Sequence, residues 1–239
     1  MRFFILLLFP ALLCAGEIPP AERKSGYEFM GRETRAMQDD QLTGPAVLWL
    51  LDGEALWTKL DCAGCHGDAR ASMKGAAARY PAVVQGKLVN LEQQVRHKAP
   101  QLSYEGRDLL ALTAYVAHQS RGMPIAVEVN EGSKVYLESG KAFFHSRQGQ
   151  LNLACAQCHD DNWGKKLAGT PIPQAHPTGY PIYRLEWQTV GSLARRFRNC
   201  LTGMRAELLP HGAPELVSLE LYLMHRARGM KLESPAVRP

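Results

Sequence analysis

The sequence of 239 residues predicts a mainly α-helical protein of two small domains, related by an internal repeat and joined by extended loops. Three observations lead to this fold class. The pentapeptide Cys-x-x-Cys-His occurs twice, apolar residues at helical spacing recur after each copy, and the alternating pattern of β-strands is scarce.

The two pentapeptides are Cys62-Ala-Gly-Cys65-His66 and Cys155-Ala-Gln-Cys158-His159. This spacing is typical of covalent c-type haem, in which both thiols add to porphyrin vinyl groups and the histidine becomes the proximal iron ligand. A zinc site would need a second close pair of Cys or His ligands beside each motif, and neither region has one. We therefore expect two covalently bound haem c groups in cytochrome c-like domains. The expected attachment residues are Cys62, Cys65, Cys155 and Cys158, and the expected proximal ligands are His66 and His159.

The first 16 residues have the pattern of a secretory signal peptide. Arg2 precedes an apolar run, 3–13, that is too short to span a bilayer, and small residues follow it. We expect cleavage near Gly16 and export to the periplasm, where haem is also attached to cysteines. Acylation of Cys14 as a lipoprotein is less favoured, because bulky Leu13 stands where such processing usually needs a small residue.

Removal of this leader would leave five cysteines, of which four bind haem. Cys200 then has no disulfide partner, so it is either a reactive thiol or a buried inert one. The formal charge of the full sequence is only +5, which gives no argument for a nucleic-acid partner or an acidic membrane surface.

Each domain is expected to follow one plan. A short helix (54–61 or 133–144) leads into the haem motif, a looped region follows, and a last helix carries apolar residues at helical spacing. The last helices match residue by residue, from 110–123 to 217–230, and Gly122 and Gly229 suit helix C-terminal caps. The expected divisions are a signal peptide at 1–16, an irregular N-terminal extension at 17–44, a first haem domain at 45–128 and a second at 129–239.

The repeat also indicates where the distal iron ligands lie. Residues 91–98 align without a gap with 193–200, so Cys200 corresponds to Lys98 and is next to the position of His97. If this segment supplies the distal ligand in both halves, Cys200 serves the second haem. His97, or less favourably Lys98, serves the first. His118 is a rival on the last helix, but its repeat partner His225 makes a structural role more plausible for both.

Three arginines stand close to Cys200, at positions 195, 196 and 198. In a helix, Arg196 and Cys200 would share one face, four residues apart. Iron and a guanidinium would both favour the thiolate, and a forked guanidinium suits an oxyanion such as a sulfonate. The alternative is that the arginines form a solvated helix face.

With these residues in place, the sequence resembles the SoxA family of dihaem cytochromes, which are subunits of SoxAX thiosulfate-oxidising complexes. The resemblance runs through most of the chain. It is densest at 155–164, 176–187, 195–200 and 235–239.

The resemblance implies an L-cysteine S-thiosulfotransferase. Such a subunit forms a heterodimer with the monohaem cytochrome SoxX, joins thiosulfate to a cysteine of the carrier SoxYZ, and passes electrons to a c-type cytochrome. It implies that Cys200 is the distal ligand of the active-site haem and carries a persulfide, and that Arg196 binds substrate.

The sequence departs from the family at the first haem. Many members have a distal cysteine there, whereas 90–98 contains none, so His97 is the preferred replacement. The alternative function is a non-catalytic dihaem electron carrier, in which Cys200 would be a bystander. A dihaem peroxidase is less favoured, because the chain is short for that family.

Overall fold

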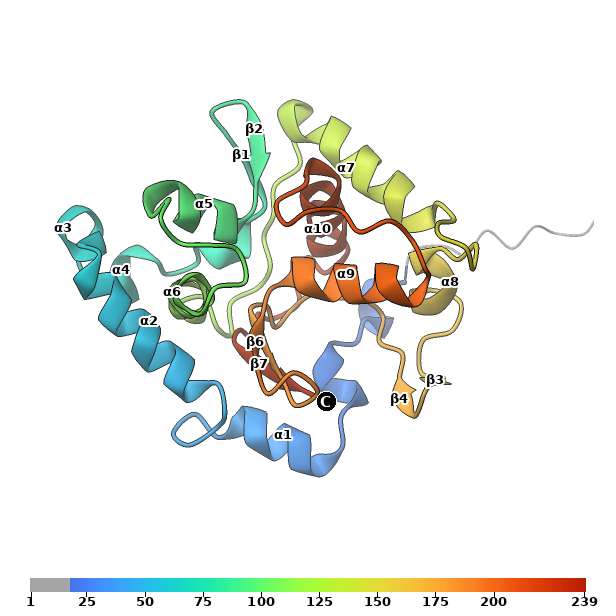
Figure 1. Ribbon diagram of the computed structural model, residues 1–239, viewed down its shortest axis with the longest axis horizontal. Coiled ribbons are helices and arrows are strands. Elements are labelled where there is room, and N and C mark those ends of the chain that lie inside the picture. The colour runs from blue at the N-terminus through green and yellow to red at the C-terminus, as the bar shows by residue number, and fades with distance from the viewer. Residues whose placement is uncertain (1–17) are drawn as a thin grey trace, which may run out of the picture.

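The structure is a computed structural model that describes residues 18–239, so the expected signal peptide lies outside the described residues. Two helical lobes stand side by side in Figure 1, the first carrying α2 to α6 and the second α7 to α10. Helix α1 and a small sheet lie below them, close to the C-terminus. Among residues 18–239, no helix is long and apolar enough to cross a membrane.

The first lobe has five helices and a hairpin: α2 (Val47–Lys59), α3 (Cys62–His66), α4 (Ala69–Ser72), β1 (Ala82–Val84), β2 (Lys87–Val89), α5 (Leu91–Lys98) and α6 (Arg107–His118). The second lobe is larger and contains α7 (Glu131–His145), α8 (Cys155–His159), β3 (Lys166–Leu167), β4 (Thr170–Pro171), β5 (Ile182–Arg184), β6 (Thr189–Gly191), α9 (Leu193–Gly203), α10 (Pro214–Arg226) and β7 (Ala236–Arg238). The mainly α-helical class and the two-lobed plan confirm the sequence-based prediction.

The same helix crossing organises both lobes: α2 packs against α6, and α7 packs against α10. The helices approach so closely that a methyl group on Gly53 would collide with the backbone oxygen of Ala111. One on Gly140 would collide with the backbone oxygen of Ser218. Ala111 and Ser218 occupy the same position in the aligned last helices. The internal repeat therefore includes the geometry of this contact.

The segments aligned as distal-ligand carriers are both helices, α5 and α9. Each begins at a side-chain cap: Asn90 accepts from the backbone N–H of Gln93 at 2.9 Å, and Ser192 accepts from that of Arg195 at 3.1 Å. Each also follows a two-stranded hairpin, β1–β2 in the first lobe and β5–β6 in the second.

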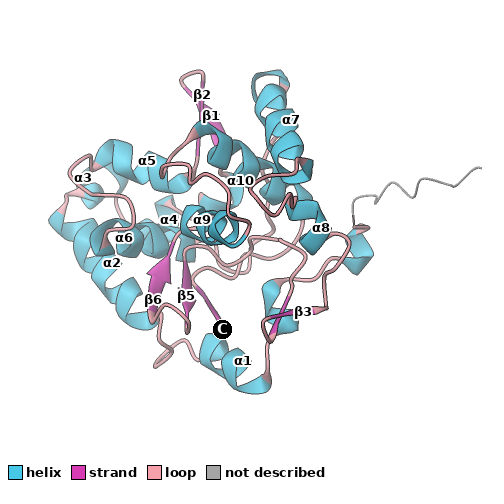
Figure 2. Ribbon diagram, turned by 45° about the vertical axis from the view of Figure 1, so that its right-hand side comes forward, coloured by secondary structure: helices cyan, strands magenta, loops and turns pink. Residues whose placement is uncertain are grey.

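A three-stranded sheet of order β6-β5-β7 supports α9 in the second lobe. Strand β5 is antiparallel to β6 and parallel to β7, with Ile182 opposite both Gly191 and Ala236. Val190, Ala236 and Val237 are buried. Figure 2 shows these strands beneath α9. The C-terminal segment thus completes the sheet whose strand β6 leads directly into α9.

The N-terminal extension is not irregular, which corrects the expectation for 17–44. It contains two 3₁₀ turns and α1 (Arg32–Asp39). The second turn forms because Ser25 and Glu28 make a capping box. The extension is held against the second lobe, since Lys24 N donates to Gln174 Oε1 at 2.6 Å and Val237 N donates to Gln38 Oε1 at 3.1 Å.

The segment between the lobes is anchored in the seam by alternate residues, while Pro124, Ala126 and Glu128 are exposed. Ile125 and Val127 are buried, and Ile125 exchanges backbone hydrogen bonds with Gly229 and Met230. Gly122 and Gly229 have φ of 80° and 83°, as expected of glycines after a helix, although the cap residues themselves are Gln119 and Ala227. Both glycines turn the chain into this seam.

Three glutamates from both lobes approach one another at the seam: Glu92 of α5, Glu105 and Glu220 of α10. Asn90 Nδ2 donates to Glu220 Oε2 at 2.8 Å. The pKa of Glu92 is raised to about 8, chiefly by burial and then by the nearby carboxylates of Glu105 and Glu220. The positive charge of Arg96 opposes this rise. Burial raises the pKa of Glu220 to about 7. Both carboxyl groups therefore titrate near neutral pH in the folded state.

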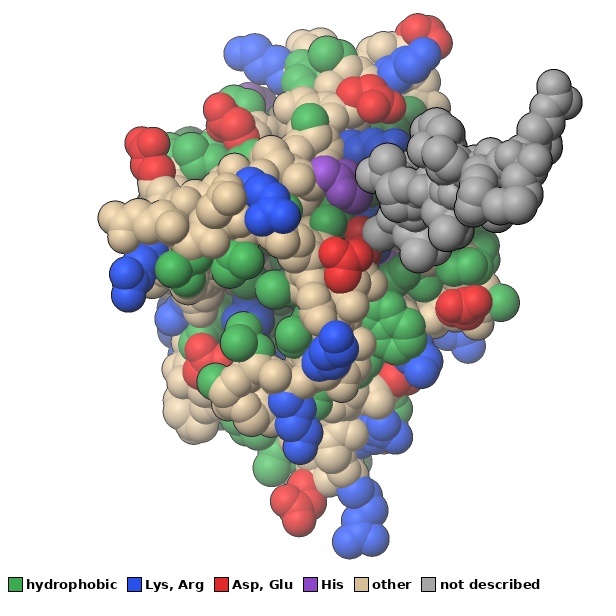
Figure 3. All heavy atoms as spheres, turned by 90° about the vertical axis from the view of Figure 1, so that its right-hand side faces the viewer, with side chains coloured by type: hydrophobic (Ala, Val, Ile, Leu, Met, Phe, Trp, Pro, Cys, Tyr) green, Lys and Arg blue, Asp and Glu red, His purple; other side chains and the backbone are tan. Residues whose placement is uncertain are grey.

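The surface does not concentrate one sign of charge on the face shown in Figure 3, which is the right-hand side of Figure 1. Basic and acidic side chains alternate there, with hydrophobic side chains between them. The face drawn in Figure 3 therefore has no patch of a single sign of charge.

We predict that Gly140→Ala destabilises the folded protein by at least about 1–3 kcal/mol, because the added methyl group must push α7 away from α10. Gly132→Ala in the same helix is the matched control. Its methyl group would meet only Asn130 Oδ1 at 3.4 Å, so stability should stay the same or rise by up to about 1 kcal/mol. Urea unfolding of the haem-loaded protein measures both, and equal effects would contradict the close crossing.

We predict that Glu92→Gln stabilises the protein more at pH 9 than at pH 6. The folded-state pKa of Glu92 is raised from 4.5 to about 8. The folded protein therefore keeps a proton that the unfolded chain loses, and stability falls as pH rises between those values, by up to about 1.4 kcal/mol per pH unit. Thermal unfolding across this range measures the effect. Glu138→Gln, at an exposed site on α7, is the control. Parallel pH profiles for wild type and Glu92→Gln would rule the effect out.

Candidate haem and substrate site

The second haem motif forms α8, which follows the long helix α7. Gln157 Oε1 accepts from Ala154 N at 2.8 Å and so caps the short helix. His159 Nδ1 lies 2.6 Å from the carbonyl oxygen of Pro173. A carbonyl can only accept, so Nδ1 carries the proton and Nε2 keeps its lone pair for a metal. These residues fit a covalently bound haem with His159 as axial ligand.

The first haem motif forms α3 and is more open. Asp61, with φ of 54°, turns the chain into the motif, and a side chain on Gly64 would collide with its carboxylate. Cys65 and His66 are exposed. The His66 ring lies 5.8 Å from that of Trp57, whose Nε1 donates to Gly67 O at 3.1 Å. The same attachment chemistry fits here, but the protein covers it less.

Cys200 lies beside the second haem motif, on the face of α9 that packs into the core of that lobe. Phe197 and Leu201 belong to the same apolar cluster as Cys155. As a free thiol, Cys155 has its pKa raised to about 12, chiefly by burial and next by the neighbouring Cys200. The pKa of Cys158 is raised by the same two causes. Cys200 therefore lies within electrostatic range of both cysteines of α8.

The three arginines of α9 have different surroundings. Arg195 lies 3.7 Å from Glu105 Oε2, and its guanidinium stacks 4.6 Å from the ring centre of Trp187. Arg198 donates to the carbonyl oxygen of Leu209. Arg196 is on the side of Cys200, four residues earlier in the helix. The idea of one solvated arginine face is wrong, because two arginines hold the helix in place and the third faces the thiol.

Two guanidinium groups, those of Arg196 and Arg184, lie within electrostatic range of Cys200. Burial acts to lower its pKa, but Cys200, Tyr180 and Glu186 outweigh it, so the pKa of Arg196 is raised. Arg184 on β5 is also close, since Arg196 and Cys200 both influence its pKa, which burial lowers. Burial raises the pKa of Tyr180, which lies within range of Arg196 and Cys200. Among the described residues, no hydrogen-bond acceptor holds the Arg196 guanidinium in the way that others hold Arg195 and Arg198.

From the sequence, Tyr180, Trp163 and Trp187 were expected only to frame a channel near the second haem or to pack on it, and Arg184 was not assigned a place at this site. Arg184 is fixed by Glu186, at 2.9 Å, and by a hydrogen bond from its Nε to Pro239 O at 2.9 Å. The one available signal for Arg184 was its place within the dense family resemblance at 176–187. Trp163, by contrast, packs on Phe29 of the extension, with ring centres 6.4 Å apart.

The distal side of the first haem stays a prediction. His97 and Lys98 occupy the last turn of α5 and are exposed. His118 lies at the end of α6. Burial lowers the pKa of His118, and the nearby charge of Arg121 lowers it further. A hydrogen bond with the backbone of Ser234, near the C-terminus, acts in the opposite direction. This places His118 in the seam between the lobes, as a structural residue would be, and keeps His97 as the preferred ligand.

A helical fold with two Cys-x-x-Cys-His helices, one of them with a prepared axial histidine, defines a c-type cytochrome. The family model described as "SoxA/TsdA, cytochrome c domain" matches residues 52–125 and 139–232. The chain belongs to the SoxA family.

Relatives and a solved structure agree. The chain is 34% identical to the L-cysteine S-thiosulfotransferase subunit SoxA of Pseudaminobacter salicylatoxidans, over 92% of this chain and 82% of that protein. It is 32% identical to the same subunit of Rhodovulum sulfidophilum, over 91% and 80%. The crystal structure of SoxXA from P. pantotrophus matches with a TM-score of 0.87 and 29% identity, over 91% of this chain and 87% of that one.

Proposed function

We propose that this protein is an L-cysteine S-thiosulfotransferase of the SoxA type, which joins thiosulfate oxidatively to a cysteine of a carrier protein. The observation that carries the proposal is the placement of Arg196 and Cys200 on one face of α9, next to the haem motif of α8. This juxtaposition brings an anion-binding group and a lone thiol to one redox site.

The chain's own residues would hold two haem c groups. The thiols of Cys62 and Cys65 would attach one and those of Cys155 and Cys158 the other, with His66 and His159 as proximal ligands. Cys200 would be the distal ligand of the second haem and His97 that of the first. Haem, when bound, supplies one-electron acceptors for the oxidation.

Arg196 orients thiosulfate through its sulfonate oxygens. The Cys200 sulfur, as a thiolate or a persulfide, forms a sulfur–sulfur bond to the terminal sulfur of thiosulfate, and two electrons are given up. The thiolate of the carrier cysteine then attacks that terminal sulfur, and the bond to Cys200 breaks. The product is a carrier cysteine bearing S–SO₃⁻, and Cys200 is restored.

The partners follow from this chemistry and from the family. The P. pantotrophus structure is of SoxXA, so we infer a SoxX-type monohaem cytochrome as the other subunit of a heterodimer. The carrier would be SoxYZ, and a c-type cytochrome would accept the electrons. Export to the periplasm, with cleavage near Gly16, stays a proposal that rests on residues 1–16.

A non-catalytic dihaem electron carrier is the weaker alternative. It gives no reason for a half-buried arginine near the thiol, whereas thiosulfate binding does.

We predict that Cys200→Ser abolishes carrier-dependent reduction of cytochrome by thiosulfate, with turnover lower by at least about a thousandfold, because the attacking sulfur is lost. The SoxAX-type complex is assayed with carrier present and both haems loaded. Thr202→Ser, at an exposed site on the same helix, is the control. Undiminished turnover in Cys200→Ser would overturn the catalytic role of Cys200.

We predict that Arg196→Met raises the KM for thiosulfate by about 10- to 100-fold, the scale of a charge-assisted hydrogen bond. Arg196→Lys should recover only part of this loss, because an ammonium lacks the fork. Arg205→Met removes an exposed arginine just beyond α9 and should leave KM unchanged. Steady-state kinetics decide the matter: equal KM values for Arg196→Met and Arg205→Met would remove Arg196 from the site.

A further inference from the structure

A buried ion pair joins the residue after the axial histidine to the end of the last helix. Arg226 Nη2 lies 2.5 Å from Asp160 Oδ1, and Nη1 lies 3.3 Å from Oδ2. The two side chains are only 3% and 4% exposed. The forked geometry fixes the direction of both groups as well as their separation.

The pair connects three elements of the second lobe. The Asp160 backbone N–H donates to Ala156 O at 2.7 Å and closes the last turn of α8, directly after His159. Arg226 ends α10, and its guanidinium lies 4.7 Å from the ring centre of Phe144 on α7 and 5.7 Å from that of Tyr222. The ion pair therefore links the C-terminal end of α8 to the place where α7 crosses α10.

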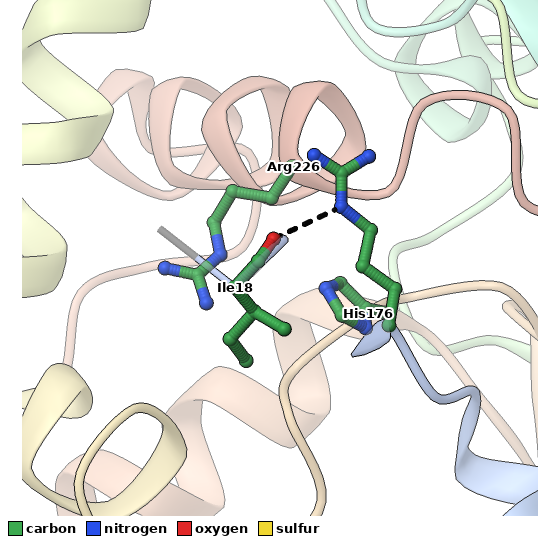
Figure 4. A pocket seen from close by; sticks show the side chains of 4 residues that line it. Ile18, His176 and Arg226 are labelled. Carbon is green, nitrogen blue, oxygen red and sulfur yellow. Dashed lines mark hydrogen bonds between the residues drawn. The ribbon is translucent and has the colours of Figure 1, made fainter. Parts of the chain in front are cut away.

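Arg226 is also enclosed from its other side. Figure 4 shows it beside a small recess with Ile18 and His176, where Arg23 Nε donates to Ile18 O at 3.4 Å. His176 is buried, and its Nδ1 lies 2.9 Å from Lys24 O. The N-terminal extension thus closes over the pair and keeps water away from it.

The first lobe has no such pair. In the aligned repeat, Asp160 corresponds to Gly67 and Arg226 to Gln119. Gly67 has a left-handed φ of 68°, and Gln119 Nε2 donates to Tyr115 O at 2.9 Å within its own helix. The ion pair distinguishes the lobe that carries Cys200 from the lobe that does not.

We propose that Asp160 and Arg226 form a positioning pair for the axial histidine of the second haem. The inference rests on the proposed attachment of haem at α8, but not on thiosulfate chemistry. Buried ion pairs add little to stability compared with apolar residues, and their best-attested use is to specify one arrangement. Here the arrangement specified is the orientation of α8, and with it the plane of the His159 ring relative to α10.

The test compares Asp160→Asn, Arg226→Met and the double variant, each in the haem-loaded complex. Ferric electron paramagnetic resonance reports the orientation of the axial ligands, and redox titration reports the reduction potential of the second haem. Asp161→Asn and Arg228→Met, two exposed neighbours, are the matched controls.

The expected result is a shifted or broadened low-spin signal of the second haem in all three variants, with both controls matching wild type. Asp160→Asn leaves the positive charge of Arg226 unpaired, so the reduction potential of the second haem should rise in this variant. A tenfold change in the equilibrium constant for reduction corresponds to about 59 mV. Arg226→Met should not raise this reduction potential. A general loss of packing would instead shift the potential in the same direction in both single variants.

The double variant keeps the proposal falsifiable if a single variant fails to fold, because replacing both partners leaves no lone buried charge. A wild-type resonance signal in the double variant would overturn the positioning role. If the purified wild-type chain carries no haem at Cys155 and Cys158, the proposed cofactor is overturned instead. A variant that loses only thiosulfate turnover, with a wild-type resonance signal, would contradict the positioning role and leave the cofactor proposal standing.

Discussion

The contact of two helix backbones at a glycine is the constraint on which both lobes depend. At Gly53 and at Gly140 the helix that leads into a haem motif crosses the last helix of its lobe with no space for a side chain. The crossing contributes to the burial of α6 and α10. Because α10 is held in this way, Arg226 at its end can reach Asp160.

The two lobes diverge in what surrounds the distal helix. The first has a short hairpin before α5, whereas the second adds β3 to β6 and receives β7 from the C-terminus. The first lobe also braces the second, since Ser192 N donates to Glu105 Oε1 at 3.4 Å and Gln93 Nε2 to Gly212 O at 3.2 Å. One lobe therefore encloses a site, and the other helps to hold the helix that forms it.

Local spacing made much of this predictable. The haem motifs, the paired helices α5 and α9 and the last helices were all visible as short patterns, although α2 begins at Val47, well before the expected 54. Contacts between distant segments were not visible: the pairing of β7 with β5, the ordered extension, and the approach of Arg184 to Arg196. A repeated Tyr-Pro pair, at 80–81 and 180–181, precedes both hairpins and could have extended the repeat. Long-range packing leaves no periodic trace in a single sequence.

The arginines of α9 show why composition alone does not identify a binding group. Arg195 pairs with Glu105 and stacks on Trp187, and Arg198 donates a hydrogen bond to the carbonyl oxygen of Leu209. Both guanidinium groups therefore make contacts within the fold. On the proposed function, the guanidinium of Arg196 would bind the external anion, in a partly buried site near Tyr180 where reduced solvent strengthens electrostatic attraction. The modest charge of the whole sequence makes no contribution of this kind. In the proposed mechanism, binding of a small dianion would therefore depend on the neighbours that leave one guanidinium without a hydrogen-bond acceptor near a thiol.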